Sequence, residues 1–211
     1  MKKRCQTALG ILLALLLTLP VPAMASGGDI LPLMPEEAVV AAVTEADIEA
    51  EKALAAAITP GVDLPVKSAV LMDQGSGTIL YAENEDVQLP PASITKVMSL
   101  LLVMEAIDSG KISLTDKVVC SDTAAAYGGS QIWLKPGEEM TVDDLLKAAA
   151  ISSANDATVC LAEYVAGSEE AFIGLMNQRA AELGMANTTF RCAAGLDQPG
   201  HLSTAKDVAI M

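Results

Sequence analysis

Two apolar runs near the middle of the chain predict a β-hairpin. Residues 66–72 and 78–82 are rich in β-prone side chains, and the connection between them contains Gly75 and Gly77. Glycines in a short connection allow the tight turn that a hairpin needs. Both runs are too apolar to lie open to water, and a two-stranded sheet is rarely stable alone. We therefore expect the hairpin to pack against other elements.

A series of helices is predicted to follow the hairpin. The first, residues 94–107, is almost entirely apolar, follows Pro90-Pro91 and is closed by Gly110. Three more helices are predicted over residues 141–150, 155–165 and 169–183. Each of these ranges has a capping residue before it or a glycine after it.

The last two of the five predicted helices carry the clearest local signals. The helix that Ser168 caps and Gly184 ends has one apolar stripe, made of Phe172, Leu175, Met176 and Leu183. Another capping box, Thr204 with Asp207, opens a helix in which the chain ends at Met211. We therefore expect the sequence to be the front part of a longer domain.

The first 25 residues predict a secretory signal peptide. A positive start at Lys2, Lys3 and Arg4 precedes an apolar run, residues 9–19, that is too short to span a bilayer. Ala23-Met24-Ala25 then forms a cleavage site, so we expect export with cleavage after Ala25. A retained membrane anchor is the alternative. Residues 26–63 are expected to be a leader or spacer before the domain at 64–211.

The charge of the chain excludes one class of partner. The 211 residues carry a formal net charge of −14, and loss of the signal peptide removes three positive charges and no acidic ones, giving 10 − 27 = −17. Binding to nucleic acid requires clustered lysines and arginines, so we expect no such partner. The acidity is typical of a protein that must stay soluble outside the cell.

The cysteines and the single histidine do not predict a metal site or a cofactor. After removal of the signal peptide, Cys120, Cys160 and Cys192 remain, and an odd number leaves at least one thiol free or paired outside the chain. Cys160 lies in an apolar run and is expected to be a small buried residue. Together with His201, these scattered cysteines lack the spacing of metal ligands.

Lys96 is the residue that does not fit its surroundings. It lies in the apolar helix predicted for residues 94–107, where burial should lower the pKa of its amine. An amine with a lowered pKa can act as a general base. Ser93 lies three residues earlier, on the same helical face and at the positive end of the helix dipole. The pair predicts a serine nucleophile that is activated without a histidine.

A Ser-x-x-Lys pattern is weak evidence alone, because Ser203 to Lys206 matches it too. That second match lies at a capped, polar helix start, so we interpret it as capping rather than catalysis. Ser153 and Asn155 support the first match, since a serine and an amide two residues apart on a tight turn can face one cleft. Ordinary N-capping of the next helix is the other explanation for them.

Taken together, these motifs closely resemble the serine-type D-alanyl-D-alanine carboxypeptidases, the low-molecular-mass penicillin-binding proteins. The resemblance covers about residues 64–211, in family order. The matching stretches are 67–73 (KSAVLMD), 89–96 (LPPASITK), 128–131 (GGSQ), 134–138 (LKPGE), 153–157 (SANDA), 195–197 (GLD) and 201–207 (HLSTAKD).

The resemblance implies a fold, a substrate and a role for each site residue. The fold would be α+β, of the penicillin-binding-protein and serine β-lactamase type, with an antiparallel sheet against a helical cluster. Ser93 would be acylated, Lys96 would take its proton, Ser153 would relay a proton to the leaving amine, and Asn155 would hold the substrate's peptide carbonyl. The substrate would be a peptidoglycan stem peptide ending in D-Ala-D-Ala, with β-lactams as inhibitors, outside the cytoplasmic membrane and with possible peripheral membrane contact.

One family motif is missing from the sequence. No Lys-Thr-Gly, which would bind the substrate carboxylate, occurs in the 211 residues. We therefore expect an N-terminal fragment that is inactive alone. A class A β-lactamase is an alternative, but its Glu-x-x-Leu-Asn pentapeptide is absent too, and a non-catalytic cell-wall-binding module is another. A Ser-His-Asp hydrolase is excluded because His201 is the only histidine and no Gly-x-Ser-x-Gly occurs, so we expect His201 to make a structural contact.

Overall fold

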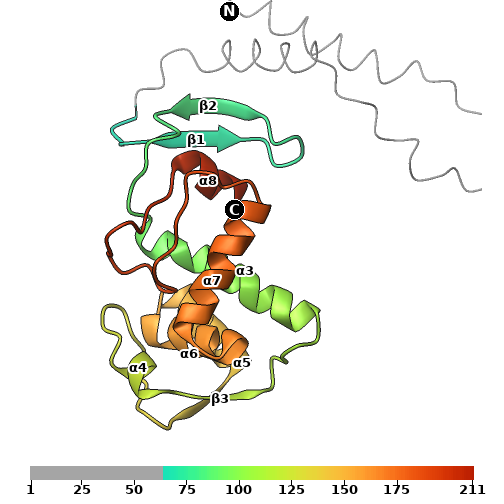
Figure 1. Ribbon diagram of the computed structural model, residues 1–211, viewed down its shortest axis with the longest axis vertical. Helices are drawn as coiled ribbons and strands as arrows, with labels where there is room; N and C mark the ends of the chain where they lie inside the picture. Colours follow the sequence, from blue (N-terminus) through green and yellow to red (C-terminus); the bar gives the residue numbers. More distant parts are fainter. Residues whose placement is uncertain (1–63) are drawn as a thin grey trace, which may run out of the picture. The chain divides into compact units, whose positions relative to one another are not determined.

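The computed structural model describes residues 64–211, so the predicted signal peptide and the predicted leader lie outside the described residues. Helices and short antiparallel strand pairs build the described part (Figure 1), which confirms the α+β class. In chain order the elements are β1 Ala69–Met72, β2 Ile79–Glu83, η2 Ala92–Ile94, α3 Thr95–Asp108, β3 Lys117–Val119, α4 Asp122–Ala125, β4 Glu139–Thr141, α5 Val142–Ile151, α6 Asn155–Ala166, α7 Glu169–Glu182 and α8 Ala205–Ile210.

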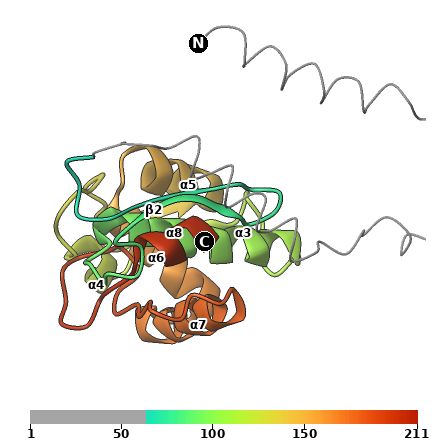
Figure 2. The same ribbon diagram turned by 90° about the horizontal axis from the view of Figure 1, so that it is seen from above.

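The predicted hairpin is present as β1 and β2, which pair antiparallel from Ala69 opposite Glu83 to Met72 opposite Ile79. The turn between them is fixed by Asp73, whose carboxylate accepts hydrogen bonds from the backbone and the hydroxyl of Ser76. The hairpin packs on α8 (Figures 1 and 2). It is less covered than the sequence predicts, because Leu71 is 54% exposed.

A second strand pair was not predicted from the sequence. β3 and β4 pair antiparallel, with Val118 opposite Met140, and β4 runs directly into α5. Each strand is only three residues long, which is too short for an alternating pattern to stand out. Val118 points into the core, while Lys117 and Glu139 form an exposed ion pair across the ladder.

Helix α6 forms the centre of the helical cluster. It contacts α3, α4, α5, α7 and β3, and most of its residues are buried. Figure 1 shows α5 and α7 beside it and α3 crossing above. Small side chains such as Ala157, Cys160 and Ala162 let these neighbours approach closely. α6 is therefore the central helix against which these helices and β3 pack.

The local signals for helix ends were reliable, whereas one position of the predicted stripe was wrong. Thr141, Ser168 and Thr204 cap α5, α7 and α8, each accepting a hydrogen bond from the backbone N–H three residues later. In α7, Phe172 and Met176 are fully buried as expected, but Leu175 is 37% exposed. The neighbours α6 and α3 cover a narrower face of α7 than the sequence pattern predicts.

All three described cysteines are free and buried. The expectation of at least one free thiol is therefore confirmed, as is the burial of Cys160, which is 1% exposed. Burial raises the pKa of the Cys120, Cys160 and Cys192 thiols. Within residues 64–211, none of the helices has the length and apolar character needed to cross a membrane.

Candidate active site

Ser93 and Lys96 lie together at the start of α3. Ser93 is in the short 3₁₀ turn η2, and Lys96 is in the first turn of the helix that continues from it. The Lys96 amine donates hydrogen bonds to Ser93 Oγ at 3.3 Å and to the carbonyl oxygen of Ala194 at 2.7 Å. The three-residue spacing thus brings the amine to the hydroxyl, as the sequence predicts.

The environment of Lys96 favours its neutral form. The residue is 4% exposed, and burial lowers the pKa of its amine, while the Cys192 sulfur acts in the opposite direction. No carboxylate among the described residues forms an ion pair with Lys96. This is the direction that the apolar helix sequence predicts, and a neutral amine can accept a proton from a nearby hydroxyl.

The backbone before Ser93 is held in a strained shape. Ala92 has a φ of +48°, which an L-residue rarely adopts. Gly195 packs against it, because a Cβ on Gly195 would lie 2.0 Å from the Ala92 carbonyl oxygen. Pro91, with φ at −76°, fixes the entry to the turn. These contacts set the position of Ser93, whose side chain remains exposed.

Ser153 and Asn155 lie on the turn between α5 and α6. Ser153 has a φ of +54°, and Ala154, which has no capping side chain, is the N-cap of α6. Neither residue is therefore an N-cap, which was the alternative to a functional role. Asn155 is buried, its backbone N–H donates to Ser130 at 2.7 Å, and its side-chain amide donates to Gly128 at 2.9 Å. The Ser153 hydroxyl makes no hydrogen bond with another described residue.

The two halves of the site meet through Gly129 and Leu196. A Cβ on Gly129 would lie 2.5 Å from the side-chain nitrogen of Asn155 and 3.4 Å from a methyl carbon of Leu196. Leu196 directly follows Gly195, which contacts Ala92. Residues 92–96, 128–130, 153–155 and 194–196 therefore converge, although Ser153 and Asn155 make no direct hydrogen bond to Ser93 or Lys96.

Asp156 is a residue whose importance the sequence interpretation missed. Its carboxylate is fully buried and accepts hydrogen bonds from the backbone N–H groups of Ile132, at 3.2 Å, and Leu134, at 3.0 Å. It thereby holds the loop that carries Ser130 against α6. Between these two anchors, Trp133 has a φ of +65° and is 76% exposed. The available signal was an aspartate beside Asn155 at the start of an apolar helix.

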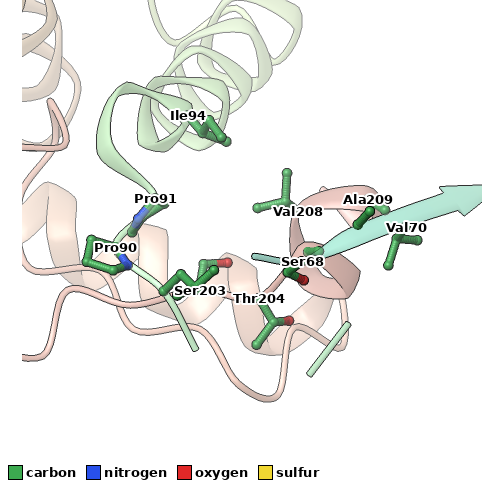
Figure 3. Close-up of a pocket in the computed structure, with 12 residues that line it drawn as sticks. Ser68, Val70, Pro90, Pro91, Ile94, Ser203, Thr204, Val208 and Ala209 are labelled. Atoms are coloured by element: carbon green, nitrogen blue, oxygen red, sulfur yellow. The ribbon is translucent and has the colours of Figure 1, made fainter. Parts of the chain in front are cut away.

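The second Ser-x-x-Lys match has a structural role, as expected. Ser203 is buried, donates to Thr188 Oγ1 at 2.8 Å and pairs through its backbone with Leu89, while Thr204 caps α8. Ser203 lies beside a cavity of about 440 Å³ between β1, α8 and the start of α3 (Figure 3). Ser93 and Lys96 do not line this cavity, so it is separate from the candidate site.

His201 is a buried structural residue, as the sequence predicts. Its Nδ1 accepts a hydrogen bond from the Arg191 backbone N–H at 2.9 Å, so the proton of the neutral ring is on Nε2. Nε2 then donates to the hydroxyl of Thr95 at 2.8 Å. Residues 64–211 hold no group of three His, Cys, Asp or Glu side chains arranged to bind a metal.

Comparison with known proteins identifies the family. The D-alanyl-D-alanine carboxypeptidase family matches residues 52–211. D-alanyl-D-alanine carboxypeptidase DacF of Bacillus subtilis (strain 168) is 54% identical over 145 residues, which cover 69% of this chain and 37% of that protein. DacC of Escherichia coli (strain K12) is 47% identical over 158 residues, covering 72% of this chain and 39% of that protein. The chain thus spans about two fifths of the length of these relatives.

Solved structures agree with the sequence comparison. Penicillin binding protein 6B from Escherichia coli has a TM-score of 0.69 at 39% identity, covering 72% of this chain and 50% of that one. Penicillin-Binding Protein D2 from Listeria monocytogenes, solved in an ampicillin-bound form, has a TM-score of 0.59 at 32% identity, with 72% and 62% covered. The predicted penicillin-binding-protein fold is therefore confirmed, and the chain belongs to the D-alanyl-D-alanine carboxypeptidase family.

Proposed function

We propose that the full-length protein is a serine-type D-alanyl-D-alanine carboxypeptidase that is acylated on Ser93. The observation that carries this proposal is the hydrogen bond from the buried Lys96 amine to the exposed Ser93 Oγ, at 3.3 Å. Burial lowers the pKa of this amine, and the exposed hydroxyl is open to a substrate. A neutral base beside an accessible hydroxyl is the minimum that serine acylation requires.

In the proposed reaction, Ser93 Oγ attacks the carbonyl carbon of the peptide bond between the two terminal D-alanines. The proton of the hydroxyl passes to the Lys96 amine as the new C–O bond forms. The C–N bond then breaks, and Ser153 relays a proton to the departing amine of D-alanine. Asn155 orients the substrate through its peptide carbonyl. Water finally hydrolyses the ester, which restores Ser93 and releases the shortened peptide as a carboxylate.

The same arrangement supports inhibition by β-lactams. In a β-lactam the bond that breaks is the ring amide, so the leaving amine stays attached to the acyl group. The ampicillin-bound and cefotaxime-bound forms of the Listeria monocytogenes protein, each 32% identical to this chain, support this assignment. The family match does not favour a class A β-lactamase or a non-catalytic cell-wall module.

We also propose an organisation and a location for the protein. Residues 1–25 would be a signal peptide, residues 26–63 a leader, and residues 64–211 the front part of the carboxypeptidase domain. The substrate, a peptidoglycan stem peptide ending in D-Ala-D-Ala, lies outside the cytoplasmic membrane, as do the cell-wall enzymes of the matching family. We also propose that the full-length protein makes peripheral contact with that membrane. The roles given above to Ser93, Lys96, Ser153 and Asn155 belong to the same proposal.

The experiment uses the full-length protein, a fluorescent penicillin and a D-Ala-D-Ala peptide. Ser93→Ala should abolish both labelling and release of D-alanine, and Lys96→Arg should do the same because a guanidinium stays protonated. Ser203→Ala is the matched control, since it alters the serine of the second Ser-x-x-Lys pattern and should keep the label. Labelling lost at Ser203 but kept at Ser93 would refute the assignment of the nucleophile.

A further inference from the structure

The Lys96 amine depends on a backbone segment that is distant in sequence. Its second hydrogen-bond acceptor is the carbonyl of Ala194, 98 residues further along the chain, at 2.7 Å. Cys192, Ala193 and Ala194 are all buried and belong to neither a helix nor a strand. The shape of this segment is therefore set by the side chains that contact it, not by a regular hydrogen-bond pattern.

Two side chains bind the two peptide groups of Ala193. The Ser99 hydroxyl donates to the Ala193 carbonyl at 2.6 Å, and the Ala193 N–H donates to Glu169 Oε1 at 2.9 Å. Fixing both peptide groups of Ala193 leaves little freedom for the next carbonyl, that of Ala194. Ser99 belongs to the same helix as Lys96, so Glu169 supplies the independent anchor, from the first turn of α7.

Glu169 is itself held in place without a cation. Tyr127 donates its phenolic hydrogen to the same oxygen, Oε1, at 2.5 Å. Burial and this hydrogen bond to Glu169 raise the pKa of Tyr127, which keeps the phenol a donor at neutral pH. No Lys or Arg in the described part of the chain forms an ion pair with Glu169. Its position at the N-terminus of α7 also favours a negative charge.

We propose that Glu169 is a positioning residue for Lys96, acting through the backbone of Ala193 and Ala194. This inference rests on the proposed function and adds a residue to it. If the Glu169 contact is lost, residues 193–194 can move away from the Lys96 amine. The amine then loses its fixed acceptor and gains access to water. Both changes work against acylation, because the amine is misplaced and its pKa returns toward the ordinary value.

The test compares Glu169→Ala, Glu169→Gln and Glu170→Ala in the full-length protein. Glu170 is the matched control because it occupies the same helical turn, is exposed and makes no hydrogen bond or ion pair with another described residue. The rate of acylation by a fluorescent penicillin is measured across pH. Glu169→Ala should lower the rate at neutral pH by about 10- to 100-fold, as expected for a misplacement on the order of 1 Å. The rising limb of the pH–rate profile of Glu169→Ala should also move to higher pH.

The conservative variant separates positioning from overall stability. Glu169→Gln keeps an oxygen that can accept from both Ala193 and Tyr127, so it should recover most of the rate lost in Glu169→Ala. A Glu169→Ala protein that is less stable but has the wild-type rate and pH profile would overturn the inference. If that variant does not fold, Glu169→Asp, with its carboxylate one methylene shorter, should show the same shift, and an unmoved profile overturns the inference there too.

Failure of this inference can be distinguished from failure of the proposed function. If Ser93→Ala keeps its label, the proposed nucleophile is wrong whatever the Glu169 variants do. If Ser93→Ala loses its label while the Glu169 variants keep the wild-type pH profile, only the positioning role of Glu169 is wrong. A Glu170→Ala variant that shifts the profile as much as Glu169→Ala would assign the effect to the charge of the α7 terminus, which also overturns the inference.

Discussion

Gly195→Ala is a sharp test of how the backbone positions Ser93. The added Cβ would lie 2.0 Å from the carbonyl oxygen of Ala92, 2.6 Å from its carbonyl carbon and 3.1 Å from the backbone nitrogen of Ser93. Real Cβ atoms essentially never approach another heavy atom within 3.0 Å, so the two segments must separate by about 1 Å. The contacted atoms belong to backbone and cannot swing aside as a side chain can. The displacement therefore falls on the residue directly before the nucleophile.

The magnitude follows from two separate costs. Gly195 has a φ of +87°, and a left-handed conformation costs an alanine about 1–2 kcal/mol. Forcing extra volume into a packed contact adds about 1–3 kcal/mol. We therefore expect the free energy of unfolding to fall by roughly 2–5 kcal/mol. A shift of about 1 Å in the nucleophile should also lower the acylation rate by about 10²-fold.

Gly184→Ala provides the control for the conformational cost. Gly184 has a similar φ of +81°, but a Cβ there would meet nothing within 4 Å. Both variants should be made in the full-length protein and compared by denaturant unfolding and by fluorescent-penicillin labelling. Gly184→Ala should lose stability by about 1–2 kcal/mol and keep the wild-type acylation rate. A Gly195→Ala protein that acylates as fast as the Gly184→Ala protein would refute the packing argument.

Three further predictions concern buried or strained side chains. Lys96→Met should abolish labelling yet raise thermal stability at neutral pH, because burial lowers the pKa of Lys96 and the variant no longer buries an amine; a lower unfolding midpoint would contradict this. Burial likewise lowers the pKa of His201 from 6.5, an effect that Asp197 partly opposes. The unfolded chain then binds the proton more readily than the folded protein, so the free energy of unfolding should fall as pH drops below about 6.5. In urea unfolding, His201→Gln should lose less of this free energy between neutral and mildly acidic pH than the wild type does. Trp133→Gly should raise the free energy of unfolding by about 1 kcal/mol, measured by the same method, because it relieves a positive φ at a side chain that buries little surface.

The features that the sequence predicts correctly are local ones. Ser93 and Lys96 are three residues apart at a helix start, so helical geometry alone brings them together. The caps at Thr141, Ser168 and Thr204 are local for the same reason, since each hydroxyl reaches a backbone N–H three residues away. Only a few residues of chain separate the interacting atoms, so no knowledge of the tertiary fold was needed.

The features that the sequence does not predict depend on distant partners. The β3–β4 pair joins residues that are 20 to 24 positions apart through strands of three residues each, and no periodicity marks these strands. The Ala194 carbonyl that holds Lys96 is a backbone group, and every residue has one. Asp156 accepts hydrogen bonds from the backbone N–H groups of Ile132 and Leu134, and nothing in the sequence distinguishes these N–H groups from others. Such partners become visible only when the fold brings them together.

Backbone strain connects these distant contacts to the site. Among residues 64–211, four non-glycine residues have positive φ. Two of them, Ala92 and Ser153, lie in the segments that converge at the candidate site, and Trp133 lies in the loop that carries Ser130. Each of these three is held by a contact from elsewhere or lies beside one: Gly195 packs on Ala92, Asp156 binds both neighbours of Trp133, and Asn155 is tied to Ser130 and Gly128. A strained conformation persists only where its surroundings fix it. The contacts made by Gly195, Asp156 and Asn155 therefore do more than stabilise the fold, because they hold the strained backbone around the candidate site in its observed shape.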